Sequence, residues 1–339
     1  MKNFLSVILI FAIAMLFPLQ VSALPASEDS LIKSIADDII YKSADITTDT
    51  PIVTYSNIDK FVNEVHTQLP QIDNRMLAEF LIEYTEQDSA DIPDEDALTY
   101  LNSKEIVISD RFIKIDADGN EMELDREQIM AELDRDKIPI TLSSHKSDNK
   151  YLQLKTVIAR QSDVVDGYVD YRVGAYATWL KMPKWHAKDT LILDFSDSVV
   201  FDSTQKVYGK LEETIKCHGI ESHYKSQIWK SDDSPDYYTN KNVEIDNHYF
   251  GGAIQFKLKP ARKIKCDCGS FMHRKKLTSI QAYVSCGISV EAGDFFNLQV
   301  IYGHTKFIGI ESDDLFNKEI PANVDVYISE KTSFTAYGN

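Results

Sequence analysis

Four oxygen-bearing side chains in the first half of the chain stand at the spacing of a calcium-binding loop. Asp116, Asp118, Asn120 and Glu127 occupy positions 1, 3, 5 and 12 of that pattern, and carboxylate and amide oxygens are ligands that calcium prefers. The loop also needs glycine at its sixth position, whereas Gly119 is the fourth residue. The segment therefore favours a β-hairpin that turns at Asp118-Gly119, and we expect no metal and no cofactor.

Aromatic side chains in two expected loops form a second group with binding chemistry. Trp185 stands next to His186, and Tyr237 stands next to Tyr238 after a run of acidic residues. Loops carry a large share of binding residues, because a rigid scaffold holds them at the surface. We predict that these four residues bind a ligand such as a sugar or a peptide.

Signatures of the common enzyme classes are missing from the sequence. It contains no G-x-S-x-G elbow, no H-E-x-x-H, no G-x-x-x-x-G-K and no G-x-G-x-x-G that follows an expected strand. The eight histidines are scattered along the chain. These patterns favour a protein that binds over one that catalyses a reaction.

Basic residues concentrate in one segment, 257–276. It holds the cations Lys257, Lys259, Arg262, Lys263, Lys265, Arg274, Lys275 and Lys276. We expect a basic hairpin that contacts an anionic cell-envelope polymer or a protein. Lysines along a solvated hairpin edge, where they discourage edge-to-edge pairing, are the alternative.

The N-terminus has the pattern of a cleavable signal peptide. Lys2 precedes an uncharged apolar run from Phe4 to Phe17, and Val21-Ser22-Ala23 supplies small residues for cleavage. The run is shorter than the roughly 20 residues that a membrane span needs. We therefore predict that residues 1–23 are removed and that the chain is secreted, with no stable membrane span after cleavage.

Export makes disulfides available to the four cysteines, Cys217, Cys266, Cys268 and Cys286. Cys266 and Cys268 lie two residues apart and share one face if they are on a strand, and either can oppose Cys286 across a hairpin. We predict a disulfide among Cys266, Cys268 and Cys286. Free buried thiols and a metal site that recruits nearby histidines are the alternatives.

The formal net charge of −17 is confined to the N-terminal part of the chain. Residues 24–150 carry 12 Lys and Arg against 29 Asp and Glu, whereas residues 151–339 carry 23 against 24. Affinity for nucleic acid comes largely from Lys and Arg that neutralise phosphates. The charge therefore argues against a nucleic-acid partner, and an acidic surface keeps an exported protein soluble.

The pattern of apolar residues predicts an α+β protein. An acidic segment, 24–142, shows helical spacing, with Ser56 as one expected helix cap, and includes a small β-hairpin over 105–124. A polar linker, 143–150, precedes residues 151–339, where apolar and polar residues alternate in successive strands. We expect the latter to form a mostly antiparallel β-sandwich-like domain.

Two of the predicted strands show this alternation most clearly. Tyr171 and Trp179 share the apolar face of a strand over 168–180, which predicts that they pack in the core. The strand over 278–290 places Cys286 on an apolar face, and its other face, including Tyr283 and Ser285, is expected to be exposed to water.

Parts of the chain resemble uncharacterised secreted bacterial proteins of the Gram-positive type. The resemblance rests on Tyr151-Leu152-Gln153-Leu154 through Ile158-Ala159-Arg160, on Ala177-Thr178-Trp179-Leu180-Lys181-Met182-Pro183 and Asp189, and on the preceding Asp118-Gly119 hairpin and Asp125 helix. It covers about half of the chain. The resemblance implies secretion but no activity, because the family has no assigned catalytic residues.

Two hypotheses about function follow from these patterns. The first is a non-catalytic exported module that binds a partner or an envelope component through the loops of the sandwich. The second is a secreted hydrolase with a dispersed active site, in which the acidic helical segment is a pro-region.

Overall fold

The structure is a computed structural model of the full chain. It describes residues 26–45, 52–85, 94–116, 118, 120–137, 149–181, 188–195, 199–200, 208–217, 220–230, 243–248, 251–257, 263–265, 272–274, 276–305, 324–328 and 332–335. For the described residues between 208 and 280, and for 26–27, 94–95, 136–137, 188, 305, 324–328 and 332–335, the description covers the backbone only.

A layer of acidic helices comes first in the chain, and one further helix follows the first hairpin. The described helices are α2 (Ala26–Ile39), α3 (Ile58–Gln68), α4 (Asn74–Tyr84), α5 (Asp94–Leu101) and α6 (Arg126–Lys137). Among the described residues no helix combines the length and the apolar character that a membrane crossing needs.

The larger sheet, sheet A, has ten strands, all paired antiparallel. Its main path runs through β1 (Tyr41–Asp45), β2 (Ile52–Ser56), β3 (Glu105–Ile115), β5 (Lys150–Arg160), β6 (Tyr168–Lys181), β15 (Lys276–Glu291), β9 (Tyr208–Cys217) and β10 (Ile220–Lys230). Two short strands lie off this path, β4 (Glu121–Leu124) beside β3 and β8 (Val199–Val200) beside β15.

The smaller sheet, sheet B, has six antiparallel strands. They are β11 (Val243–His248), β12 (Gly251–Lys257), β7 (Lys188–Phe195), β16 (Phe295–Thr305) and β17 (Val324–Ile328), with β18 (Thr332–Thr335) beside β16. A separate ribbon pairs β13 (Lys263–Lys265) with β14 (Met272–Arg274). These elements confirm the predicted α+β class.

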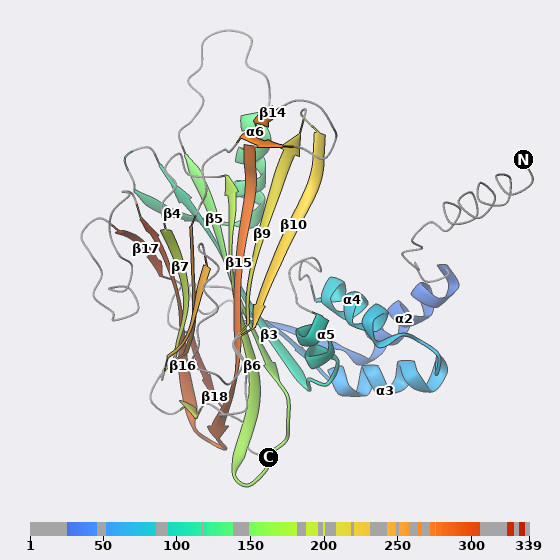
Figure 1. The fold of residues 1–339 in the computed structure, drawn as a ribbon. Helices are drawn as coiled ribbons and strands as arrows, with labels where there is room; N and C mark the ends of the chain where they lie inside the picture. The colour runs from blue at the N-terminus through green and yellow to red at the C-terminus, as the bar shows by residue number, and fades with distance from the viewer. Residues whose placement is uncertain are drawn as a thin grey trace, which may run out of the picture.

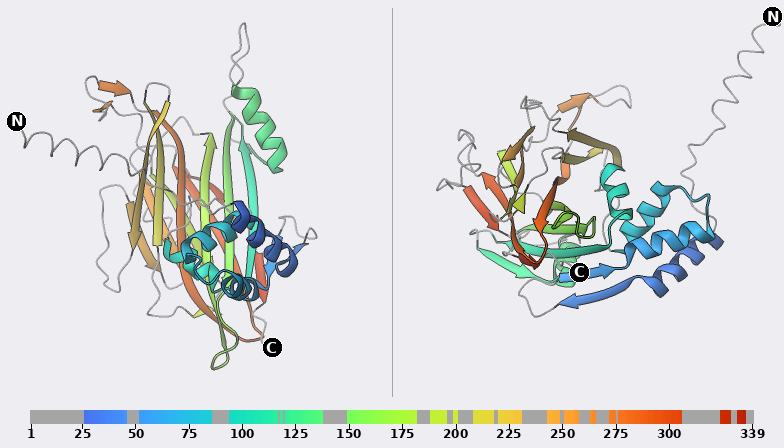
Figure 2. Two further views of the ribbon diagram at one scale, coloured as in Figure 1. Left: turned by 90° about the vertical axis from the view of Figure 1, so that its right-hand side faces the viewer. Right: turned by 90° about the horizontal axis from the view of Figure 1, so that it is seen from below.

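The structure forms three cores: two large ones on opposite faces of sheet A, and a small one where α6 packs against β3 and β5. The first lies between the two sheets and contains the alternating apolar residues of β6, β15, β7 and β16, including Tyr171, Trp179 and Cys286. The second lies between sheet A and helices α2–α5. Figures 1 and 2 show these helices together on one side of the sheet.

The outer face of β15 differs from the prediction. Tyr283 and Ser285 were expected to be exposed to water, but both are buried, at 1% and 0% exposure. The predicted alternation of the strand is confirmed, since its apolar residues lie in the core between the sheets. The helical layer covers the face that the pattern assigned to solvent, because polar residues there find partners on α5.

The N-terminal segment contributes strands to the interior of sheet A. β3 pairs with β5 over its whole length, from Glu105 opposite Arg160 to Ile115 opposite Lys150, and β2 pairs with its other edge. The sheet therefore continues across the predicted boundary at 143–150, and residues 24–142 share one sheet with the chain that follows them.

The predicted hairpin over 105–124 is present as β3 and β4. Asp116 accepts hydrogen bonds from the backbone N–H groups of Asp118 and Asn120, each at 2.9 Å, and from the amide Nδ2 of Asn120 at 2.8 Å. These donors belong to the turn itself. The Asp116 carboxylate, which would be the first ligand of a calcium-binding loop, thus stabilises a hairpin turn.

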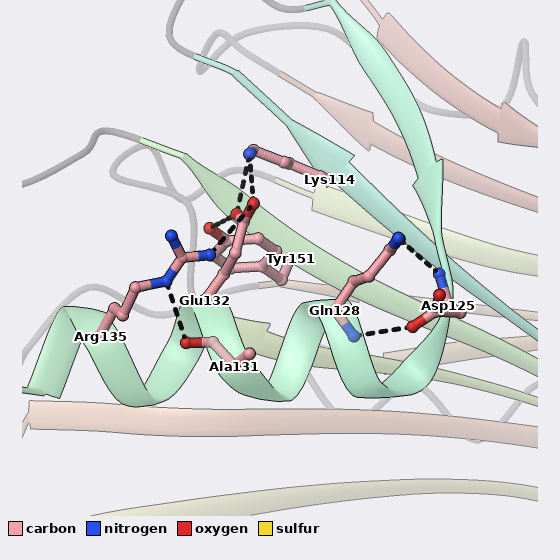
Figure 3. A network of polar contacts seen from close by, with 7 residues as sticks. All are labelled: Lys114, Asp125, Gln128, Ala131, Glu132, Arg135 and Tyr151. Carbon is pink, nitrogen blue, oxygen red and sulfur yellow. Dashed lines mark hydrogen bonds and ion pairs between the residues drawn. The ribbon is translucent and has the colours of Figure 1, made fainter.

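Helix α6 begins at a capping box and lies against β3 and β5. Gln128 N donates to Asp125 Oδ1 at 2.7 Å, and Asp125 N donates to Gln128 Oε1 at 3.2 Å. One turn later, Lys114 Nζ lies 2.8 Å from each carboxylate oxygen of Glu132, and Tyr151 donates to the same group at 2.6 Å. Figure 3 shows both sets of contacts.

These contacts also set the protonation of Glu132. Burial by itself raises the pKa of the carboxyl, but the hydrogen bonds from Lys114 and Tyr151 outweigh it and hold the pKa below its ordinary value.

The start of α3 departs from the prediction. Asn57, in the left-handed region with φ of 67°, precedes the helix and makes no side-chain capping bond. Ser56, the expected cap, donates instead to Glu105 on the neighbouring β3 at 3.4 Å. The Ser56 hydroxyl, which was predicted to cap the helix, therefore bonds a side chain on the neighbouring strand.

A buried ion pair joins helix α5 to the centre of sheet A. Arg172 Nη2 on β6 lies 2.9 Å from Asp96 Oδ1 and donates to Ser285 Oγ on β15 at 2.7 Å. Ser285 donates to Asp96 Oδ2 at 2.9 Å, and the Tyr283 hydroxyl donates to the same oxygen. The side chains of Asp96 and Arg172 are 2% and 10% exposed.

Packing around this ion pair fixes the position of Tyr283. Its ring stacks on Tyr176 with centroids 4.5 Å apart, and a Cβ on Gly174 would lie 2.9 Å from a ring carbon. Burial, with the charge of Asp96 adding to it, raises the pKa of Tyr283 well above its ordinary value. The hydroxyl therefore stays protonated and available as a donor.

Removing one partner of this ion pair should strongly destabilise the folded protein. We expect Arg172→Met to lower the free energy of unfolding by about 3–5 kcal/mol, because Asp96 would remain buried with an uncompensated charge. Urea unfolding measures the loss. The control is Arg75→Ala, which breaks the exposed pair with Glu79 and should leave the free energy nearly unchanged. Equal, small losses in both variants would contradict this account.

Candidate functional site

An aspartate–histidine pair between the two sheets is the described group that most resembles catalytic machinery. His304 Nδ1 on β16 lies 2.8 Å from Asp189 Oδ1 at the start of β7. Such a pair activates a nucleophile in many enzymes when a hydroxyl or thiol lies beside it.

The surroundings of this pair close it off. Asp189 Oδ2 accepts from the Tyr302 hydroxyl and, at 3.4 Å, from the Trp179 indole, which also donates to Tyr302 at 2.7 Å. All four side chains are at most 1% exposed. The cluster therefore ties β6, β7 and β16 together inside the core between the sheets.

The residues predicted from the sequence to bind ligands or to lie in the core have different outcomes. In the described part of the chain no group of three or more His, Cys, Asp and Glu is arranged to hold a metal ion. The predicted binding residues Trp185, His186, Tyr237 and Tyr238 lie outside the described residues. The core positions predicted for Tyr171 and Trp179 are confirmed, since both are buried between the sheets.

The predicted basic hairpin 257–276 includes the ribbon of β13 and β14. Lys263 pairs with Arg274, and Lys265 pairs with Met272, so alternation along the strands places these four residues on one face of the ribbon.

The cysteine prediction is resolved only at Cys286. Its thiol is free and 2% exposed, and it lies in the core between the sheets, with Val173 opposite it on β6. Cys266 and Cys268, with which a disulfide was predicted, lie outside the described residues.

Exposed apolar side chains gather at the end of the sandwich opposite the ribbon. The tight turn that joins β5 to β6 is held by two backbone hydrogen bonds between Val165 and Tyr168, at 2.8 and 2.9 Å. Its central residues, Asp166 and Gly167, have φ of 51° and 88°, as a two-residue hairpin turn requires. Figure 1 shows this hairpin projecting at the lower end of the molecule.

The turn between β15 and β16 lies beside the first one. Ala292 N donates to Gly167 O at 2.7 Å, and Asp294 N donates to Glu291 O at 3.0 Å. β8 reaches the same end, because Val200 pairs with Ser289 near the end of β15. We call this end of the sandwich the apolar tip, and define it by Val164, Val165, Tyr168, Val200 and Phe295, which are 36%, 58%, 41%, 51% and 63% exposed.

The apolar tip carries side chains on both outer faces of the sandwich. Val169, Val290 and Phe296 point into the core between the sheets, so alternation places their neighbours on the outside. Tyr168 and Val200 therefore lie on the outer face of sheet A, while Phe295 lies on the outer face of sheet B. The tip is a wedge that is apolar on two sides.

The charged residues in the two turns of the apolar tip are all acidic. Residues 161–169 and 291–300 contain no Lys or Arg, and Asp166, Glu291 and Asp294 are exposed. At the base of the turn Lys104 pairs with Asp163, and their hydrogen bond lowers the pKa of that carboxyl. The apolar side chains thus have an acidic border.

The sequence analysis did not find the apolar tip. Its signal is present in Val164-Val165-Asp166-Gly167-Tyr168, where two valines directly precede an Asp-Gly turn. Turns at a protein surface are normally rich in polar residues, and an apolar pair at such a position is therefore informative once the turn is recognised.

Cys286 should be unreactive in the native protein. Burial raises the pKa of its thiol to about 12, so almost no thiolate is present near neutral pH. After exposure of the folded chain to N-ethylmaleimide, peptide mapping should show Cys286 unmodified, and the same treatment in urea should label it. Labelling of native Cys286, or a disulfide to it, would contradict the structure.

Comparisons with known proteins give structural likenesses alone. No family model matches the chain, and no curated protein matches it. AvmM, which catalyses macrocyclization in alchivemycin A biosynthesis, is 13% identical, with 60% of this chain and 97% of that chain covered and a TM-score of 0.24.

Two Clostridium perfringens toxins give similar values. For the NetB toxin in its membrane inserted form, the identity is 10%, the coverage 48% and 80%, and the TM-score 0.21. For the delta-toxin they are 7%, 68% and 88%, and 0.20. TM-scores this low carry no argument about the function of the chain.

Proposed function

We propose that the protein is an exported, non-catalytic binding module whose contact surface is the apolar tip. The observation that carries this proposal is the exposure of Val165 and Phe295, at 58% and 63%, beside three further exposed apolar residues. An apolar patch with a polar border commonly marks an interaction site, because water disfavours leaving such a surface uncovered.

The buried polar groups support a binding role over a catalytic one. Asp189 and His304 have their hydrogen bonds inside the core, and Asp96 and Arg172 bind each other beneath α5. In the part of the chain that the structure describes, these residue types with catalytic potential stabilise contacts between layers. The apolar tip, by contrast, exposes apolar side chains that a partner can cover.

The alternative function, a hydrolase with residues 24–142 as a pro-region, fits the sheet less well. Removing that segment would strip β3 from β5 along 11 residues. It would also leave Arg172 without Asp96. Both losses fall on the middle of sheet A, so we place the helical segment in the working protein.

The partner predicted for the basic hairpin 257–276, an anionic envelope polymer or a protein, requires a different contact surface. β14 directly precedes β15, and the apolar tip follows its other end, so the two surfaces are separated by the length of a strand of 16 residues. At 3.3 Å per residue this is about 50 Å. One set of variants can therefore test each surface separately.

Adsorption to isolated bacterial cell envelopes tests the proposed contact surface. Such envelopes present lipid, anionic polymer and protein together, and co-sedimentation measures the bound fraction. The double variant Val165→Asp/Phe295→Asp should lose at least tenfold in adsorption, because charges would replace the two most exposed apolar groups of the tip. Circular dichroism should show an unchanged fold, since both positions are at the surface.

Two further variants make the envelope experiment decisive. Met122→Asp/Met130→Asp removes apolar residues that are 57% and 45% exposed away from the tip, and it should adsorb like the wild type. Lys263→Gln/Lys265→Gln should also adsorb normally. If the lysine variant alone is released, or if the tip variant adsorbs as well as the wild type, the tip is not the contact surface.

A further inference from the structure

The wedge shape of the apolar tip indicates what kind of partner it meets. Tyr168 and Val200 lie on the outer face of sheet A, and Phe295 lies on that of sheet B. A flat protein surface of the usual kind would cover one of these faces and leave the other in water. A fluid layer that surrounds the end of the sandwich covers both faces at once.

We propose that the apolar tip enters the headgroup region of a bilayer made of zwitterionic phosphatidylcholine. This inference rests on the proposed binding function and names the chemistry of its partner. Tyr168 and Phe295 suit this region, since aromatic side chains concentrate at membrane–water interfaces. The three valines supply aliphatic surface around them.

The size of the apolar tip agrees better with lipid than with a protein partner. Its five side chains expose about a few hundred Å² in all, whereas a stable protein interface buries roughly 800 Å² on each partner. Shallow entry of a few apolar groups gives weak, reversible attachment. We expect a partition constant on the order of 10⁴ M⁻¹, as for a single acyl chain.

The acidic border limits both the depth of entry and the lipid that is accepted. Asp166 stands at the apex of the first turn, and Glu291 and Asp294 flank the second. Carboxylates do not enter the hydrocarbon, so the tip stops at the headgroups. There the negative charges face the choline cations, while an anionic headgroup repels them.

The backbone holds the apolar tip in one shape before any partner is present. The bond from Ala292 N to Gly167 O joins the two turns, and the bonds between Val165 and Tyr168 close the first. The Lys104–Asp163 pair ties the base of that turn to the segment after α5. Little conformational freedom is therefore lost on binding, which favours attachment through so few side chains.

Vesicle flotation with three proteins tests the proposal. The full chain should float with phosphatidylcholine vesicles, and Val165→Asp/Phe295→Asp should reduce the bound fraction at least tenfold. Met122→Asp/Met130→Asp is the matched control and should bind like the wild type. Replacing a third of the lipid by phosphatidylglycerol should weaken wild-type binding.

A single substitution tests the role of the acidic border. Asp166→Asn keeps a residue that tolerates the left-handed φ of this turn, so the hairpin should stay intact while one charge is removed. Binding to pure phosphatidylcholine should be retained. Binding to the vesicles with phosphatidylglycerol should rise several-fold relative to the wild type.

Three results would overturn the inference. They are wild-type protein that does not float with phosphatidylcholine, tip and control variants that float equally, and tighter binding to the anionic vesicles. If the tip variant is released from cell envelopes but the wild type ignores vesicles, the lipid inference fails while the binding function stands, and a protein or polymer is then the partner. Equal adsorption of tip variant and wild type to envelopes contradicts the function itself.

Discussion

The ion pair between Asp96 and Arg172 is the constraint on which the arrangement of the layers depends. Both side chains are nearly fully buried, and a charge in such a place is tolerated only when a partner of opposite charge and hydrogen bonds compensate it. Arg172 comes from the centre of sheet A, so α5 must dock on that sheet. The other helices then bury their apolar faces in the same layer.

This constraint explains how an acidic N-terminal segment and a near-neutral sheet form one unit. β3 supplies the covalent and hydrogen-bonded connection, and α5 supplies the charge that the sheet needs. The carboxylates of Asp96 and Asp189 are thereby buried and bind partners inside the molecule. The contact surface that we propose, the apolar tip, contains none of these buried polar groups.

Much of the architecture could be predicted from local patterns. Alternation in 278–290 identified the core face of β15, and the Asp118-Gly119 turn identified a hairpin. Each of these signals depends on the geometry of a short stretch of backbone. For that reason each survives in the folded protein.

Contacts between distant segments escaped the sequence analysis. Helix α5 has eight residues, too few for a periodic pattern to stand out, yet it buries the outer face of β15. β9 and β10 are rich in Glu and Lys and gave no clear strand signal. The apolar tip forms only when two turns far apart in sequence come together, which no local pattern records.

Native-state hydrogen exchange measures most directly whether the helical layer and sheet A are one unit. The account predicts that amides of α5 and β3 exchange with the same free energy of opening as those of β6 and β15, because Asp96 cannot leave Arg172 without opening the sheet. Exchange of α2–α5 and β3 through a separate opening of much lower free energy, with β6 and β15 still protected, would contradict it.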